Sequence, residues 1–282
     1  MPHRRAVALM VLVTLLWSMA GVVTRQLEAA RSFELTFWRS SFNALTLVLI
    51  LGAQRGFALG GQLLRASRAV WVSSFCWAAM FTAFMVALTL TRVANVLVTM
   101  ALGPLLTALF ARVFLKHRLP ARTWLAIIVG SAGVAWMFAD ELSGKGLLGM
   151  AVAFVVPIAA ATNWTLLQGR PAEDMPLALL LGGLISAAFA LPLAWPLQAG
   201  LHDLALLAVL GVFQLALPCL LLIRLTRTLS APEVALLGLL EVVFGVLWAW
   251  LGAGETPTTA TLIGGVMVLG ALAANELLAA SS

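Results

Sequence analysis

Long apolar runs separated by short polar stretches recur from one end of the chain to the other. Each run is about 20 residues long, the length of an α-helix that crosses the hydrocarbon core of a bilayer. The runs are continuously apolar, whereas strands of a membrane barrel alternate between apolar and polar residues. The pattern predicts ten transmembrane helices, five on each side of a polar break from Asp140 to Lys145. Their expected ranges are residues 6–23, 33–53, 69–90, 94–115, 121–139, 147–168, 177–198, 204–223, 232–253 and 259–278.

The composition supports lipid as the main solvent of this chain. Of its 282 residues, 62% are hydrophobic and only 10% are charged, whereas about 25% of the residues of a soluble domain are charged. So few charged residues can cover only short loops. We therefore expect an all-α polytopic membrane protein, with a first five-helix repeat over residues 1–140 and a second over residues 146–282.

The basic residues indicate the orientation of the helices. In a soluble protein, the formal net charge of +6 would suggest nucleic acid as a partner. Here the Lys and Arg residues lie mostly between the predicted spans, so no nucleic-acid partner is expected. With the amino terminus inside, twelve of these residues fall on the cytoplasmic side and five outside. This bias predicts that both termini are cytoplasmic, in a bacterial-type inner membrane.

An odd number of spans in each half requires that the two halves have opposite orientations in the membrane. A weak internal similarity supports such an inverted repeat. A shift of 138 positions aligns Leu102-Gly103-Pro104-Leu105 with Leu240-Glu241-Val242-Val243. The polar break between the halves also falls at the midpoint of the chain. Together these features predict two oppositely oriented bundles around a central pathway.

Four groups of short motifs lie in or beside the predicted helices. They are Leu15-Leu16-Trp17-Ser18, Phe37-Trp38-Arg39, Pro104 with Phe114-Leu115-Lys116-His117-Arg118-Leu119 and Trp124, and Leu240-Glu241 with Gly254-Glu255-Thr256 and Leu262-Ile263-Gly264. Together they resemble the EamA family of the drug/metabolite transporter superfamily. The chain departs from the family pattern at His117 and Val242, where the family often has a glutamate and a proline. These two positions therefore support no family-wide role.

The resemblance implies a ten-helix exporter or exchanger. It also implies a central cavity lined by the first, third, fourth, sixth, eighth and ninth helices. Within the family, the size and the tryptophan-rich cavity candidates are most similar to YddG-type amino-acid exporters.

Three polar side chains near the middle of predicted spans are candidates for substrate contact. Glu241 is the one carboxylate placed there, where an ionised group costs several kcal/mol unless it is paired or hydrated. It is interpreted either as a proton-coupling group or ammonium partner, or as a brace between helices. Asn163 and Gln214 would bind the polar end of a zwitterion or, equally, form hydrogen bonds between helices.

Large aromatic and thioether side chains near mid-span form a second set of candidates. They would shape a site for an apolar or aromatic group, or they would face lipid. The set consists of Trp17, Trp77, Met80, Phe81, Met100 and Trp164. Pro104, Pro157 and Pro218 interrupt the fourth, sixth and eighth helices, and the resulting kinks serve either gating or static packing.

Enzymatic chemistry finds little support in the sequence. His3, His117 and His202 lie in separate tails or loops, so no metal cluster is expected. No phosphate-binding Gly-rich loop with its lysine is present, which argues against an ATP-driven motor in this chain. We expect neither a catalytic residue nor a cofactor.

The sequence favours a secondary transporter that exports small metabolites, amino acids including aromatic ones, by alternating access. A carrier of nucleotide sugars or lipid-linked groups is the alternative, although such anions would need several inward-facing cations and none is evident mid-span. A lipid-modifying membrane enzyme and a structural subunit of a larger complex are further alternatives. Small residues at Ala126, Gly130, Ala260 and Gly264 indicate close helix packing, by default within the fold and otherwise in a homodimer. The expected partners are membrane lipid and a small-molecule substrate.

Overall fold

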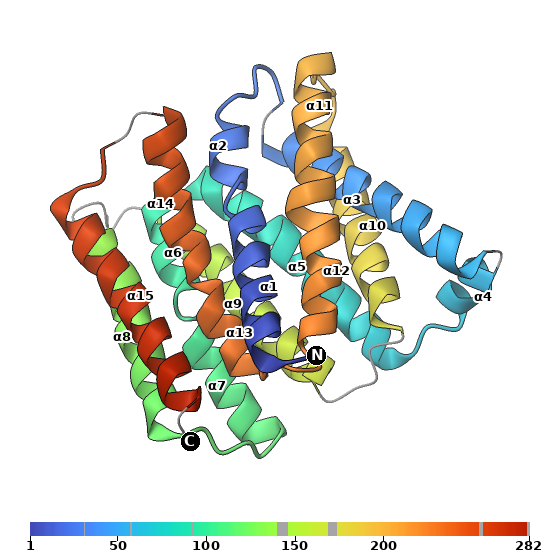
Figure 1. The fold of residues 1–282 in the computed structure, drawn as a ribbon. Coiled ribbons are helices and arrows are strands. Elements are labelled where there is room, and N and C mark those ends of the chain that lie inside the picture. The colour runs from blue at the N-terminus through green and yellow to red at the C-terminus, as the bar shows by residue number, and fades with distance from the viewer. Residues whose placement is uncertain are drawn as a thin grey trace.

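The structure is a computed structural model that describes residues 1–30, 32–56, 58–91, 93–139, 146–168, 174–253 and 256–280. Within these ranges every element of regular secondary structure is a helix, and the helices pack as one bundle (Figure 1). The predicted polar break at residues 140–145 lies outside the described residues, as do Gly254 and Glu255 of the ninth-helix motif.

The helices of the first half are α1 (His3–Trp17), α2 (Ala20–Thr24), α3 (Ser32–Arg55), α4 (Ala58–Leu64), α5 (Arg68–Leu90), α6 (Val93–Met100), α7 (Gly103–Phe114) and α8 (Ala121–Met137). Those of the second half are α9 (Leu147–Gln168), α10 (Met175–Ala194), α11 (Leu201–Val209), the π-helix η1 (Leu210–Ala216), α12 (Leu217–Leu225), α13 (Ala231–Gly238), α14 (Leu240–Ala253) and α15 (Thr259–Ala280). In the described residues, nine helical segments are long and apolar enough to cross a membrane, and α8 is a shorter apolar helix. The predicted polytopic all-α fold with ten helices is confirmed.

Several spans are interrupted near their middle. The first is divided between α1 and α2 at Ser18 and Met19, the fourth between α6 and α7 at residues 101–102, and the ninth between α13 and α14 at Leu239. The eighth continues from α11 to α12 through the wider turns of η1. Irregular backbone at membrane depth is tolerated where it lies within protein or lines a cavity.

The three predicted proline interruptions have different local structures. Pro104 occupies the first turn of α7, immediately after the break in the fourth span. Pro157 lies inside the helix α9, where it removes one backbone donor. Pro218 occupies the first turn of α12, just after the π-helix.

The seventh predicted helix ends earlier than expected. Helix α10 ends at Ala194 and not at residue 198, because Pro196 disfavours a helical conformation for the residue before it. The chain beyond is held by Glu34, whose Oε1 accepts hydrogen bonds of 2.8 Å from the backbone N–H groups of Gln198 and Ala199. The short helix α4 was not predicted.

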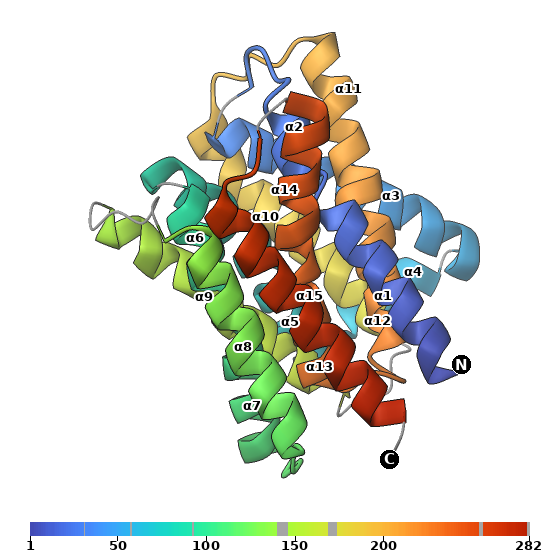
Figure 2. The same ribbon diagram turned by 60° about the vertical axis from the view of Figure 1, so that its left-hand side comes forward.

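The two ends of the molecule differ in what they contain. The amino and carboxyl termini lie at the same end, whereas α2 and the start of α11 lie at the opposite end (Figures 1 and 2). We call these the terminal end and the distal end. Helices α8 and α15 lie side by side, and a Cβ atom on Gly133 would be 2.9 Å from the carbonyl oxygen of Gly264. Gly133 and Gly264 therefore serve packing within the fold.

Candidate functional site

A cavity of about 170 Å³ lies among the interrupted helices, and it is smaller than the volume of about 300–1,000 Å³ that is usual for small-molecule sites. Its wall is made by α1, α3, α5, α6, α7, α9, η1, α12, α13 and α14. All six spans that the family resemblance implies contribute to it. The second span adds one residue, Arg39 on α3.

Eight of the nine residues predicted to contact substrate line this cavity. They are Trp17, Trp77, Met80, Phe81, Met100, Trp164, Gln214 and Glu241. Pro104 and Pro157 also line it, whereas the lining does not include Pro218. The structure thus brings most of the predicted set together, and a role of these residues in binding substrate stays a prediction.

Asn163 is the residue of that set that the structure places elsewhere. It is completely buried, and its Oδ1 accepts a hydrogen bond of 2.6 Å from Ser73 Oγ. This bond joins α9 to α5 behind the cavity wall. The geometry favours the inter-helix alternative over substrate contact for Asn163.

Arg39 is a buried cation that sequence reasoning missed. Only 2% of it is exposed. Its Nη2 donates to the carbonyl oxygen of Phe81 at 3.1 Å, and its Nη1 donates to Gln214 Oε1 at 3.5 Å. The amide of Gln214 in turn donates to the carbonyl oxygen of Trp17 at 3.4 Å. The sequence prediction placed Arg39 beside an outer loop and not in the cavity, and the Phe37-Trp38-Arg39 motif was the signal that could have indicated its role.

Close packing of η1 against α3 holds Arg39 and Gln214 beside each other. A Cβ atom on Gly211 would lie 2.8 Å from the carbonyl oxygen of Arg39 and 2.5 Å from Phe42 Cβ. Only glycine permits this approach without displacement of the backbone. The π-helical turns then place Gln214, one turn further on, beside the guanidinium group, and π-helical turns often occur at functional sites.

Glu241 lies in the first turn of α14, directly after the break at Leu239. The positive end of the helix dipole favours a carboxylate at this position. Glu241 and Arg39 line the same cavity. Yet among the described residues no ion pair of 4.0 Å or less joins them. The cavity thus holds a guanidinium group and a carboxyl group that are not in direct contact as an ion pair.

Aromatic rings form much of the remaining wall. The rings of Trp77 and Trp164 meet edge to face with centroids 5.2 Å apart, and the ring of Phe81 lies 5.6 Å from that of Trp77. Helix α10 supports this wall from behind, because a Cβ atom on Gly182 would be 2.5 Å from Trp77 Cβ.

Three residues of the lining carry a buried polar atom that has no hydrogen-bond partner within the described part of the chain. These atoms are Arg39 Nε, Trp77 Nε1 and Thr107 Oγ1. A buried polar group without a partner costs about 1–3 kcal/mol.

A second cavity adjoins the first on the side of the distal end. The two share Trp17, Phe84, Leu97, Glu241 and Val242 in their linings. The second cavity continues along α2 to the stretch from Thr256 to Thr261. Glu241 therefore lies at the boundary between the two cavities.

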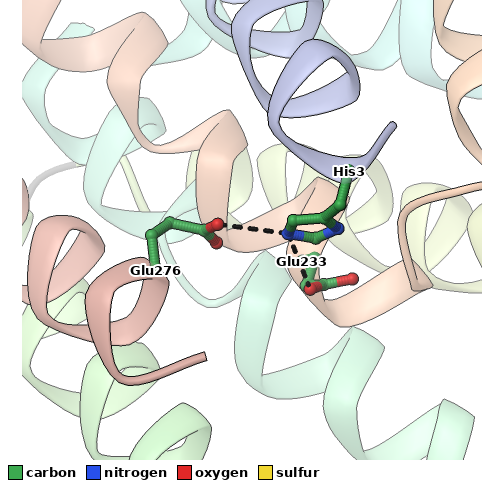
Figure 3. Close-up of side chains that lie close together, drawn as sticks. All are labelled: His3, Glu233 and Glu276. Atoms are coloured by element: carbon green, nitrogen blue, oxygen red, sulfur yellow. Dashed lines mark hydrogen bonds and ion pairs between the residues drawn. The ribbon is translucent and has the colours of Figure 1, made fainter. Parts of the chain in front are cut away.

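The terminal end carries a group of side chains that sequence reasoning did not anticipate. His3, Glu233 and Glu276 point toward one another from α1, α13 and α15 (Figure 3). The expectation that the chain has no metal cluster stays a prediction, although these three side chains lie close enough together to hold an ion. It considered the three histidines alone, and the two carboxylates lie more than 200 positions away in the sequence.

Comparisons with known proteins identify relatives of the whole chain. Residues 4–139 and 147–275 match the model of the EamA-like transporter family. The pseudopaline exporter CntI of Pseudomonas aeruginosa strains UCBPP-PA14 and PAO1 is 26% identical over 274 residues, which cover 94% of this chain and 94% of the exporter. A solved crystal structure superposes with a TM-score of 0.84 at 19% identity and covers 99% of both chains. That last likeness concerns the fold alone.

Proposed function

Because the chain belongs to the EamA-like transporter family, we propose that it exports or exchanges a small zwitterionic metabolite, with amino acids, including aromatic ones, as the favoured substrates. Membership of this family makes the chain a membrane transporter and not an enzyme. One observation carries the proposal for the substrate. A single cavity combines a buried cation, Arg39, a carboxylate, Glu241, and an aromatic wall around Trp77.

Each part of the cavity suits one part of such a substrate. Arg39 would bind the carboxylate, because a guanidinium group presents its donors in a fork that matches two carboxylate oxygens. Glu241 would bind the ammonium group, and Gln214 would hold Arg39 in position. The paired rings of Trp77 and Trp164 would contact an apolar or aromatic side chain.

Alternating access would carry the substrate across the membrane. Half-helices that end at a central site are typical of carriers whose two repeats rearrange around it. The interruptions at Ser18, Leu102 and Leu239 lie at or beside this cavity. The second cavity supplies the path to the distal end.

Two other substrate classes remain as candidates. Pseudopaline is the second candidate, and the match to its exporter over 94% of both chains favours it. An anion such as a nucleotide sugar is less favourable, because Glu241 would repel it within the same cavity.

Counterflow in proteoliposomes tests the proposal. Purified protein is reconstituted with an unlabelled amino acid inside, and uptake of radiolabelled amino acids, their carboxamide analogues and pseudopaline is followed. We expect exchange of a zwitterion and no exchange of its carboxamide. If no amino acid moves in either direction, the amino-acid assignment fails, and exchange of pseudopaline alone would establish the second candidate.

For the orientation, we propose that the terminal end faces the cytoplasm of a bacterial-type inner membrane. The twelve basic residues on that side, against five on the other, support it. In spheroplasts, a tag at either terminus should be inaccessible from the outside of the inner membrane. A tag placed at Lys145 should be accessible from that side.

A further inference from the structure

Three side chains from distant parts of the chain form one group at the terminal end. Nε2 of His3 lies 3.2 Å from Glu276 Oε2 and 3.9 Å from Glu233 Oε1, and the three atoms all lie within 4.8 Å of one another (Figure 3). The side chains of His3, Glu233 and Glu276 are 43%, 23% and 26% exposed. The group is thus accessible to solvent, unlike the central cavity.

From this geometry we infer that His3, Glu233 and Glu276 form a binding site for a divalent metal ion of the zinc type, which joins the ends of α1, α13 and α15. Three protein ligands leave one position of a tetrahedral ion for water. Imidazole nitrogen together with carboxylate oxygen suits zinc better than calcium or magnesium, which prefer oxygen ligands alone.

The two distances from His3 are close to those that such an ion requires. Three donors at about 2.0–2.2 Å from a tetrahedral ion are about 3.3 Å from one another. His3 and Glu276 are already at 3.2 Å. The contact with Glu233, at 3.9 Å, needs a shift of about half an ångström, which a partly exposed side chain makes by small rotations.

Glu233 is already oriented for this task. In the capping box at the start of α13, its Oε2 accepts a hydrogen bond of 2.7 Å from the backbone N–H of Ser230. This bond fixes the carboxylate and turns Oε1 toward His3. A hydrogen bond that orients a ligand in this way typically accompanies a protein metal site.

Charge also favours a cation in this group. Two carboxylates beside a neutral imidazole carry a charge of about −2, which a divalent ion neutralises. Arg4 and Arg5 follow His3 in the chain and are exposed. Their repulsion of a cation is screened by solvent and salt, so it weakens the site without abolishing it.

The position of the site gives the ion a structural consequence. Glu233 lies one residue before Val234, which lines the central cavity. The start of α13 is also tied to α9, because Gln168 Oε1 accepts a hydrogen bond of 3.0 Å from the backbone N–H of Ala231. A bound ion would add α1 and α15 to this connection and hold the terminal end of the bundle together. Only an effect of the bound ion on transport would depend on the proposed function.

Zinc titration of the purified full-length chain, with any affinity tag removed, tests the site. Competition with a fluorescent zinc indicator should give one saturable site in the wild type. H3A and E276Q should each weaken it at least tenfold. H117A is the matched control, because His117 is an exposed histidine outside the group, and it should bind zinc as the wild type does.

Thermal unfolding without metal checks that the variants fold, and zinc should raise the melting temperature of the wild type and of H117A only. Unchanged affinity in H3A and E276Q would overturn the inference. The absence of saturable zinc binding to the wild-type chain would overturn it as well. Neither result depends on whether the chain transports an amino acid.

Discussion

Replacement of Arg39 by methionine should separate the role of this side chain in binding from its role in stability. Methionine retains most of the aliphatic volume and removes the charge. The structure loses one good hydrogen bond, to the carbonyl oxygen of Phe81 at 3.1 Å, and a long one to Gln214 at 3.5 Å. Removal of a buried charge offsets this loss, because a guanidinium group is desolvated in the bundle. We expect the free energy of unfolding to change by no more than about 1 kcal/mol.

The expected effect on substrate affinity is larger. A hydrogen bond to a charged group contributes about 1.5–3 kcal/mol, and in the proposed complex Arg39 makes one with the substrate carboxylate. At about 1.4 kcal/mol for each factor of ten, the dissociation constant should rise about 10- to 150-fold. The substrate and its carboxamide should then bind the variant with similar affinity, because the group that distinguishes them is gone.

The assay measures binding and folding on the same samples. Binding of the radiolabelled substrate found by counterflow is compared with binding of its carboxamide in the wild type and in R39M. Thermal unfolding is followed with a thiol-reactive dye, which reports the exposure of the partly buried Cys76 and the buried Cys219. R224M is the control, since Arg224 is exposed at the end of α12. If R39M retains the affinity within about twofold and still prefers the acid, then Arg39 does not bind the carboxylate.

Three further predictions follow from the packing around the cavity. G211A should lower the free energy of unfolding by about 1–3 kcal/mol, visible as a lower melting temperature, because the added Cβ meets the backbone of Arg39; an unchanged melting temperature would contradict the close packing. E241Q should flatten the pH dependence of counterflow, since glutamine cannot ionise, and an unchanged profile would leave Glu241 only a bracing role. N163L should lower the melting temperature through loss of the bond to Ser73 while the half-saturation concentration stays the same; a raised half-saturation concentration would restore substrate contact for Asn163.

The sequence predicts the membrane fold well because lipid imposes one simple condition on a spanning segment. About 20 apolar residues in a row are needed to cross the hydrocarbon core, and this condition holds for the unbroken span α9 and for the broken one made of α6 and α7. Hydropathy therefore located both. It could not show that the second is divided, because both parts of a broken helix are as apolar as an unbroken one.

The cavity is predicted in part, for a related reason. Trp77 and Gln214 lie mid-span, and their depth follows from counting residues along a helix. Arg39 lies nearer the end of its predicted span, so the count of residues along the helix placed it beside an outer loop. The structure instead buries it. Asn163 is at the right depth but on the face of α9 that meets α5. Depth can be counted from the sequence, but the direction of a side chain around the helix axis depends on the neighbouring helices. His3 depends on them even more, since its partners come from two other helices.

The interruptions themselves bear on the predicted repeat. The shift of 138 positions that aligns Leu102 with Leu240 also places residue 101, in the break of the fourth span, opposite Leu239, in the break of the ninth. The same shift places Met19, in the break of the first span, opposite Pro157 inside α9. Residue 101, Leu239 and Pro157 line the central cavity, and Met19 lies two residues after Trp17, which also lines it. Chance similarity among apolar helices would not concentrate the matching irregularities around one cavity. If the two halves are equivalent in this way, the first half can adopt the present conformation of the second. That conformation would open the cavity toward the opposite end of the molecule. One cavity could then serve both sides of the membrane in turn.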